Sequence, residues 1–337
     1  MRAGCEPVMD TSERESLLLE AFAFAPNEAA ASWRRWRETV DLDTLEGHYL
    51  HLLPMLAHRL DEWLADDEAR QRIQGIVRRA WTRNQLALRG LASAVGALRE
   101  AGVERIVVAG SAAWALVAAR QKSIRPVESL ELLTCRDDAA LAVNTFERQG
   151  WQLLPGFPRP EGAVLDHREG VWLANQRHER LKLGWRLLPC PPELARSREK
   201  PSGVLPVEVH GVALHVPLAE EMLLQALCGY RESNQVDWRW DALLLVAAHP
   251  PDWARLEELV ADEATARERL AELDQRWQAA VPEHVLKPRQ NWFRRRLNKV
   301  WRDYHWHAWQ AGTEVSWAGF AAYCPRRWWR VLVRSRA

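Results

Sequence analysis

The sequence predicts an α+β fold, in which a small mixed β-sheet with flanking helices is enclosed by N- and C-terminal helical segments. Apolar residues recur at helical spacing before residue 101 and again after residue 216. Between these segments, short apolar runs are separated by turn-forming residues, as in strands. The chain has 337 residues, of which 47% are hydrophobic and 27% charged, and this composition suffices for a core without disulfides.

These patterns divide the chain into four parts. Residues 1–100 form an N-terminal helical segment, 101–216 an α/β core, 217–285 a C-terminal helical domain, and 286–337 a basic, Trp-rich tail. From Lys287 onward, twelve Lys or Arg and two Asp or Glu give a charge of +10, against +1 for the whole chain. We expect this basic tail to contact an anionic membrane surface, nucleic acid or the acidic body of the protein.

Several classes of protein are excluded by composition. The five Cys are scattered and form no C-x-x-C pair, so the sequence indicates neither a zinc site nor a thioredoxin-like one. The first residues include acids and no apolar core, unlike a signal peptide. No apolar run approaches the ~18 residues of a membrane-spanning helix. We therefore expect a cytoplasmic protein, with peripheral membrane association through the tail as an open alternative.

The N-terminal segment ends in one long amphipathic pattern, from Asp67 to Glu100, which Gly102 terminates. Its helical spacing predicts a single helix with one apolar face toward a core. The residues expected on that face are Ile73, Ile76, Trp81, Leu86, Leu91, Val95 and Leu98.

Within the α/β core, the period of the apolar pattern becomes that of strands and short helices. Ile106–Ala109 is expected to be a buried strand that leads into a helix over 112–120. Further strands are expected at 127–134, 151–154, 163–167, 171–174 and 180–187, with a helix over 137–149 and a hairpin over 207–216. Helices are expected again at 217–227, 238–248, 251–260 and 264–280.

Nucleotidyl transfer needs three groups of side chains around one phosphate. A helix N-terminus with a hydroxyl holds the polyphosphate, and two carboxylates at i and i+2 on a strand grip a divalent metal. The reaction also needs a third carboxylate on a neighbouring strand. Gly110 and Ser111 would supply the helix start, although Gly-Ser before an Ala-rich helix is more commonly a plain turn. On the next strand Ser129 and Glu131 share a face while Glu128 lies opposite, so only one carboxylate occupies the paired position.

Five stretches occur in the order found in a known family. They are Arg83-Asn84, Ala109-Gly110-Ser111-Ala112, Arg125-Pro126-Val127-Glu128-Ser129-Leu130-Glu131-Leu132-Leu133-Thr134, Arg180-Leu181-Lys182-Leu183-Gly184-Trp185-Arg186-Leu187, and Arg239-Trp240-Asp241 with Asp252-Trp253. Over residues 42–282 the chain thereby resembles the uncharacterised bacterial nucleotidyltransferases. The resemblance implies a nucleotidyltransferase-like core that transfers a nucleotidyl group from an NTP to an unknown acceptor, with Mg²⁺ as cofactor.

The resemblance also implies roles for individual residues. Gly110, Ser111, Arg125 and Arg239 would contact the nucleotide phosphates, and Glu131 would ligate the metal. For Arg239, an ion pair inside the helical domain is the alternative interpretation.

The chain departs from the family pattern at the positions that carry the chemistry. Ala109 replaces a Lys, Gly184 replaces a His, and Ser129 and Glu131 replace the two Asp. The third carboxylate position is Lys182, whose positive charge disfavours a metal and would instead hold phosphate as a fixed cation.

Another pair could restore the missing groups, because Glu208 and His210 are same-face neighbours on the expected hairpin. Two hypotheses of different classes follow from the substituted positions. One is a nucleotidyltransferase with impaired chemistry, in which Glu131, Ser129 and Lys182 form the catalytic site. The other is a catalytically degenerate protein that binds or scaffolds partners through its cleft or its basic tail.

Overall fold

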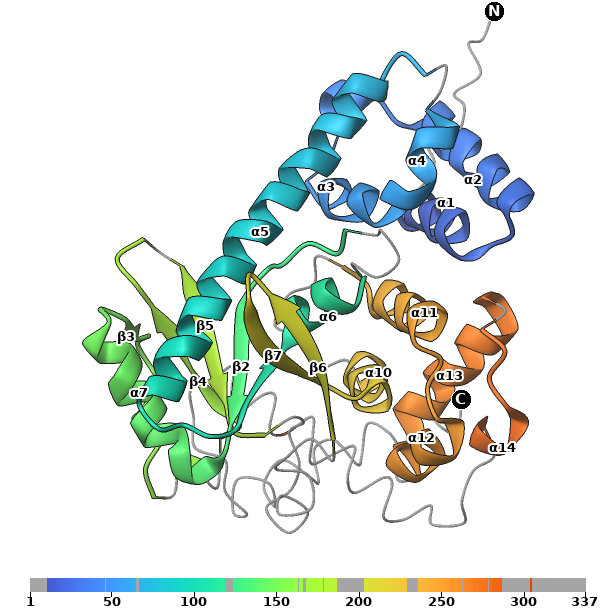
Figure 1. Cartoon of the computed structure of the whole chain (residues 1–337). Coiled ribbons are helices and arrows are strands. Elements are labelled where there is room, and N and C mark those ends of the chain that lie inside the picture. Colours follow the sequence, from blue (N-terminus) through green and yellow to red (C-terminus); the bar gives the residue numbers. More distant parts are fainter. Residues whose placement is uncertain are drawn as a thin grey trace, which may run out of the picture.

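The computed structural model describes most of the chain up to residue 286 (Figure 1). The described residues are 11–45, 47–64, 67–118, 124–162, 164–165, 168–177, 179–186, 203–228, 236–261, 263–277, 279–286 and 304. The basic tail predicted at 286–337 lies outside the described residues, apart from Leu286 and Tyr304.

The N-terminal segment is helical, as its periodicity predicts, and ends in one helix far longer than the rest. Short 3₁₀ turns at Leu42–Thr44 and Leu53–Leu56 interrupt it. Its α-helices are α1 (Thr11–Ala23), α2 (Pro26–Thr39), α3 (Tyr49–Leu52), α4 (Ala57–Trp63) and α5 (Arg70–Glu100). Figure 1 shows α5 running from these helices down to the sheet, so α5 joins the two regions.

The predicted core face of α5 is wrong at two positions. Ile73, Leu91 and Leu98 are fully buried, but Trp81 is 53% exposed and Leu86 is 65% exposed. Around the helix, Trp81 lies about 80° and Leu86 about 140° from the fully buried Ile73. Leu86 therefore lies on the outer surface of α5, and Trp81 lies at the flank of its buried face.

The central sheet has five strands, in the order β1-β2-β5-β4-β3. Strands β2 and β5 are parallel, and the other neighbouring pairs are antiparallel. Helix α6 (Gly110–Ala118) follows β1 directly, and α7 (Ala139–Arg148) follows β2. The strands are β1 (Ile106–Ala109), β2 (Leu130–Thr134), β3 (Gln152–Leu153), β4 (Gly170–Ala174) and β5 (Arg180–Gly184). The prediction of an α+β fold with a small mixed sheet is confirmed.

The two faces of this sheet differ in chemistry. Leu132, Leu181 and Val171 point into the main hydrophobic core and are almost fully buried. The alternating residues of the same strands, Glu131 on β2 and Lys182 on β5, lie on the opposite face because side chains alternate along a strand. The sheet therefore presents an apolar face to the main core and a second, polar face, on which Glu131 and Lys182 lie beside a small buried cluster of Val107, Ala109 and Leu133.

Three predicted elements differ from the structure. Strand β2 begins at Leu130 rather than at 127. Among residues 163–167, the two described residues, 164 and 165, are helical instead of extended. A helix was expected to begin at Pro217, but Pro217 is paired with Val204 in a β-hairpin and is the last residue of β7.

That hairpin is a second, two-stranded sheet formed by β6 (Val204–Val209) and β7 (Val212–Pro217). It confirms the predicted hairpin and extends it at both ends. Strand β7 packs against β1, so the hairpin borders the central sheet without joining it.

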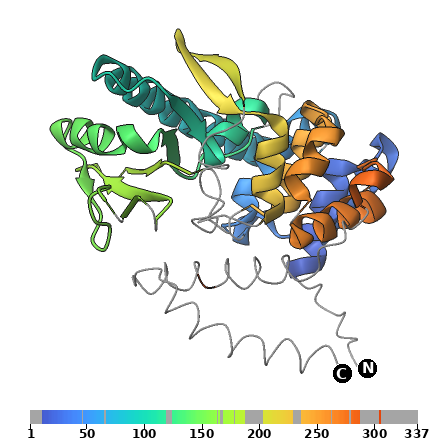
Figure 2. The ribbon, with the colours of Figure 1, turned by 90° about the horizontal axis from the view of Figure 1, so that it is seen from below.

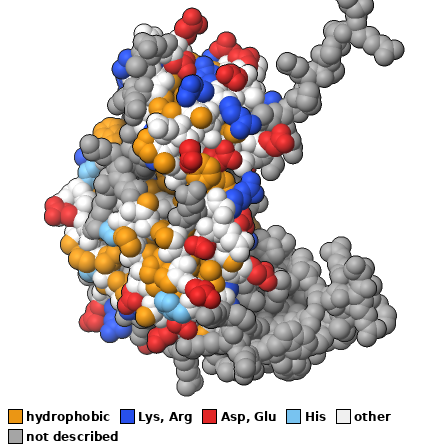
Figure 3. All heavy atoms as spheres, turned by 90° about the vertical axis from the view of Figure 1, so that its right-hand side faces the viewer, with side chains coloured by type: hydrophobic (Ala, Val, Ile, Leu, Met, Phe, Trp, Pro, Cys, Tyr) orange, Lys and Arg blue, Asp and Glu red, His pale blue; other side chains and the backbone are white. Residues whose placement is uncertain are grey.

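The C-terminal helices pack against the N-terminal ones (Figure 2). The Phe22 and Trp240 rings lie 5.1 Å apart, and those of Phe24 and Trp277 lie 5.9 Å apart. On this side of the molecule, acidic and basic side chains are interspersed (Figure 3). The helices are α10 (Ala219–Cys228), α11 (Trp238–Ala248), α12 (Trp253–Val260), α13 (Ala264–Trp277) and α14 (Glu283–Leu286). One continuous core thus joins both ends of the described chain.

A membrane-crossing helix would have to be both long and strongly apolar. None of the helices within the described ranges meets both conditions.

Gly110 is the residue at which β1 turns into α6, and its backbone requires glycine. Its φ is +56°, and a Cβ built on Gly110 would collide with the carboxylate of Glu131. We expect Gly110→Ala to lower the free energy of unfolding by at least about 1–2 kcal/mol, the cost of left-handed φ alone. Urea denaturation measures this loss.

The matched control is Gly75→Ala, because Gly75 lies in α5 with no atom near its would-be Cβ. We expect this control to be neutral or to stabilise by up to about 1 kcal/mol through helix propensity. Equal destabilisation by both variants would contradict the left-handed conformation of Gly110.

Candidate functional site

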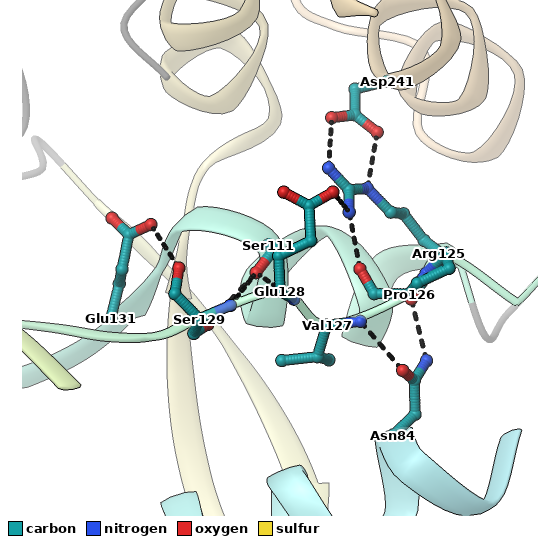
Figure 4. A network of polar contacts seen from close by, with 9 residues as sticks. All are labelled: Asn84, Ser111, Arg125, Pro126, Val127, Glu128, Ser129, Glu131 and Asp241. Carbon is teal, nitrogen blue, oxygen red and sulfur yellow. Dashed lines mark hydrogen bonds and ion pairs between the residues drawn. The ribbon is translucent and has the colours of Figure 1, made fainter. Parts of the chain in front are cut away.

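The segment 125–129, which leads into β2, is held by side chains from two helices (Figure 4). Asn84 of α5 donates from Nδ2 to the Arg125 carbonyl oxygen at 2.7 Å and accepts from the Val127 amide at 2.8 Å. The Asn84 side chain is buried, so these two bonds replace those of a β-ladder. This replacement explains why β2 begins at Leu130 and not at residue 127.

Ser111 fastens the same segment from the start of α6. Its Oγ accepts the amides of Glu128 at 3.0 Å and Ser129 at 3.1 Å, and donates to the Ser129 carbonyl oxygen at 3.1 Å. A hydroxyl has one donor and two acceptor positions, so Ser111 is saturated by its own chain. The predicted phosphate contact of Ser111 stays a prediction, and it would require these bonds to break.

Arg125 is buried and connects the segment to α11. Its Nε and Nη2 reach the Asp241 carboxylate at 3.1 and 3.3 Å, and its Nη1 reaches Glu128 at 2.8 Å (Figure 4). Burial by itself would lower the pKa of Arg125, but the Asp241 and Glu128 carboxylates outweigh burial and raise that pKa. Arg125 is thus a permanently charged clamp between the core and the C-terminal helices.

Arg239, the other arginine predicted to hold phosphate, pairs within the helical region. Its Nε lies 2.7 Å from Asp237, and its Nη1 lies 3.6 Å from Glu272 of α13. The hydrogen bond to Asp237 is the main cause of its raised pKa. The alternative interpretation, an ion pair within the helical domain, describes this geometry. Phosphate binding by Arg125 and Arg239 stays a prediction.

Glu131 places its carboxylate directly over Gly110, where α6 begins. Ser129 supports it, because its Oγ donates to Glu131 Oε1 at 3.2 Å (Figure 4). The start of a helix attracts negative charge through its free amides and its dipole. The Glu131 carboxylate therefore occupies the position over Gly110 at which the sequence predicted a nucleotide phosphate.

Lys182 is the neighbour of Glu131 on the next strand. The two residues are direct partners in the parallel β2–β5 register, so their side chains emerge on the same side of the sheet. Lys182 Nζ also lies 3.4 Å from Glu169 Oε1, and Trp172 is its register partner on β4. Ser129, Glu131 and Lys182 thus belong to one site on the polar face of the sheet.

Two residues of this site were missed from the sequence. Glu169 precedes β4, and Trp172 lies within β4, and both meet Lys182 only because β4 pairs with β5. The alternation along Val171, Trp172 and Leu173 indicates on which face of the strand Trp172 lies. No local pattern indicates that this strand pairs with the strand that carries Lys182. The alternative donors, Glu208 and His210, lie on the separate β6–β7 hairpin.

These side chains do not fit a magnesium site of the kind the family implies. Mg²⁺ prefers carboxylate and water oxygens in an octahedral arrangement, and an ammonium group has no lone pair to offer. Here a Lys separates Glu131 from Glu169, and Ser129 contributes only a hydroxyl. Over the described ranges, no three His, Cys, Asp or Glu side chains gather as metal ligands. Lys182 thus places a positive charge between these two carboxylates.

Removing the carboxylate of Asp241 should destabilise the protein strongly. Asp241 is fully buried, so Asp241→Asn leaves Glu128 as the remaining carboxylate partner of the Arg125 charge among the described residues. We expect a loss of about 3 kcal/mol of unfolding free energy, as for other broken buried pairs. Denaturant titration checks this value.

Asp237→Asn is the control for this prediction. The Asp237–Arg239 pair is about 30% exposed, at 32% and 29%, and Asn can still cap α11. We expect the control to cost less than about 1 kcal/mol. A cost for Asp241→Asn no larger than that of the control would show that Arg125 is not an essential clamp.

Comparison with known proteins agrees with this architecture. A search of curated proteins found no match. A family model described as an uncharacterised nucleotidyltransferase matches residues 46–272, which include the central sheet, the Arg125 clamp and Lys182. The match covers well over half of the chain. The chain therefore belongs to the uncharacterised nucleotidyltransferase family.

Proposed function

We propose that this chain is a catalytically degenerate member of the nucleotidyltransferase family, which binds nucleotide phosphates without a divalent metal and does not transfer a nucleotidyl group. The observation that carries the proposal is the position of Lys182, which stands beside Glu131 in register where the family resemblance calls for a carboxylate. Lys182 would supply the positive charge that Mg²⁺ supplies in a metal-dependent relative. This proposal develops the binding-protein hypothesis and not the impaired-enzyme hypothesis.

The environment of Lys182 supports a role in anion binding. Its side chain is 17% exposed, and that of its partner Glu169 is 27% exposed, so both remain accessible from one side. An incoming phosphate would displace the Glu169 carboxylate from Lys182, exchanging one anion for another of higher charge.

The same environment opposes metal-assisted transfer. A divalent cation beside Lys182 would meet a like charge, and Ser129 offers a much weaker ligand than a carboxylate. We therefore propose binding without release of pyrophosphate, so the protein would act as a nucleotide-responsive binding or scaffolding module. Contacts of the basic tail with a membrane surface, nucleic acid or the acidic body lie outside the described residues and stay predictions.

Calorimetric titration with ATP, GTP, CTP and UTP tests this function, in buffer with EDTA and in buffer with Mg²⁺. We expect at least one nucleotide to bind equally well in both buffers, with no pyrophosphate released. Binding that requires Mg²⁺ and is accompanied by pyrophosphate release would contradict the proposal and would favour active nucleotidyl transfer.

Variants of Lys182 identify the residue responsible. Lys182→Ala should weaken nucleotide binding by roughly 10- to 100-fold, the value of one charge-assisted contact, whereas Lys182→Arg should retain most of the affinity. Arg105→Ala is the control, because Arg105 is exposed and lies just before β1, at the end of that strand farther from Glu131. If both alanine variants bind like the parent protein, Lys182 is not the phosphate contact.

Restoring acidic side chains should create a metal site. The double variant Ser129→Asp/Lys182→Glu replaces a hydroxyl and an ammonium group by carboxylates beside Glu131 and Glu169. We expect this variant to bind Mg²⁺ or Mn²⁺ measurably by calorimetry, whereas the parent protein does not. Arg105→Glu adds a carboxylate at an exposed position before β1, away from Glu131, and should gain no metal binding.

A further inference from the structure

Trp172 of β4 lies on the polar face of the central sheet, beside Lys182. Along β4 and β5 the leucine and valine side chains of the apolar face are fully buried, whereas Trp172 and Lys182 are partly exposed. The two are direct partners in the antiparallel β4–β5 register, so their side chains emerge next to each other, with Cα atoms about 5 Å apart. A large aromatic ring thus stands beside the ammonium group.

The neighbours of Trp172 on this face leave room beside its ring. Two residues away along β4, on the same face, lie Gly170 and Ala174, the two smallest residue types. Among the described residues, no aromatic ring stacks on Trp172 and no guanidinium lies over it. A partly exposed indole of this kind can receive the flat ring of a ligand.

Arg180 adds a second positive charge to the same face. It lies two residues before Lys182 on β5, so both side chains point the same way, about 6.7 Å apart along the strand. Arg180 is exposed, and within the described part of the chain it forms no ion pair. Its register partner is the small Ala174, so Arg180 and Trp172 are diagonal neighbours with space between them.

The charges on this face give a bound polyphosphate one direction. Glu131 lies beside Lys182 on β2, and Glu169 precedes β4, at the end of the strand pair opposite to Arg180. Both carboxylates repel a polyphosphate and Arg180 attracts it, so the chain of phosphates should extend from Lys182 towards the start of β5. Trp172 flanks this path at one strand spacing, about 4.8 Å, which a ribose can bridge.

We propose that Trp172 is the platform on which the nucleobase stacks, while Lys182 and Arg180 hold the phosphates. This inference rests on the proposed function, because it needs phosphate binding at Lys182. The nucleotide would lie over β4 and β5 and not over Gly110 at the start of α6. Stacking on Trp172 would select nucleotides over inorganic polyphosphate, and it would accept any base, because every base has a flat face.

Calorimetric titration of the full chain with ATP and with inorganic tripolyphosphate, both in EDTA, tests this platform. We expect Trp172→Ala to weaken ATP binding by roughly 10- to 100-fold, the value of one base–aromatic stack, and to leave tripolyphosphate binding unchanged. Trp172→Phe should retain most of the ATP affinity, because a phenyl ring also stacks. Trp172→Leu keeps apolar bulk without a ring and should lose affinity as Trp172→Ala does.

Arg180→Ala separates the phosphate contact from the base contact. We expect it to weaken the binding of ATP and of tripolyphosphate alike, by roughly tenfold, because Arg180 contacts phosphates only. Trp81→Ala is the matched control, since Trp81 is 53% exposed on α5, outside the sheet. It should bind both ligands like the parent protein, with circular dichroism showing that all variants are folded.

The inference is overturned if Trp172→Ala and Trp172→Leu bind ATP like the parent protein, or if they weaken ATP and tripolyphosphate binding equally. The proposed function stands in both cases, provided that Lys182→Ala weakens metal-free tripolyphosphate binding. If the parent protein binds neither ligand in EDTA, the proposed function and the inference are overturned together.

Discussion

The arrangement of the whole site depends on one buried interaction, the ion pair between Arg125 and Asp241. Arg125 precedes β2, and Asp241 lies on α11, 116 residues further along the chain. The pair holds the C-terminal helices against the segment that carries Ser129 and Glu131. Asn84 and Ser111 complete this arrangement, since they bond the backbone of the same segment from α5 and α6. A buried charge with two carboxylate partners allows few alternative positions for that segment.

Because β2 continues directly from this fixed segment and pairs with β5, Glu131 lies over Gly110 and beside Lys182. Its carboxylate occupies the positive end of α6, and the neighbouring strand presents an ammonium group where a metal-binding carboxylate would be expected. The side chains at these positions therefore differ from the set that the family resemblance implies, because an ammonium group and a hydroxyl stand where carboxylates were expected.

Helix α5 serves both sides of this arrangement. Its inner face buries Ile73, Leu91 and Leu98 and provides Asn84 to the site, whereas its outer face carries unneutralised arginines. An isolated helix with so many like charges would be destabilised by their repulsion. Packing of the inner face against the core offsets that repulsion, so α5 can carry these charges on its outer face.

The sequence by itself determined the class of fold and the order of the elements. These depend on local periodicity and on residue type, both of which can be read within a few positions. The family resemblance placed Ser129, Glu131 and Lys182 in one site, and their convergence on one face of the sheet agrees with it.

Only the tertiary structure decided which partners these residues have. The sequence could not show that Arg125 is neutralised by Asp241, that Glu169 and Trp172 meet Lys182, or that the Ser111 hydroxyl is saturated by its own chain. Each of these contacts joins segments brought together by strand pairing or helix packing, so no local pattern encodes it. The exposure of Trp81 and Leu86 was missed for a related reason, because hydrophobicity indicates a tendency to be buried while packing decides which side of a helix is covered.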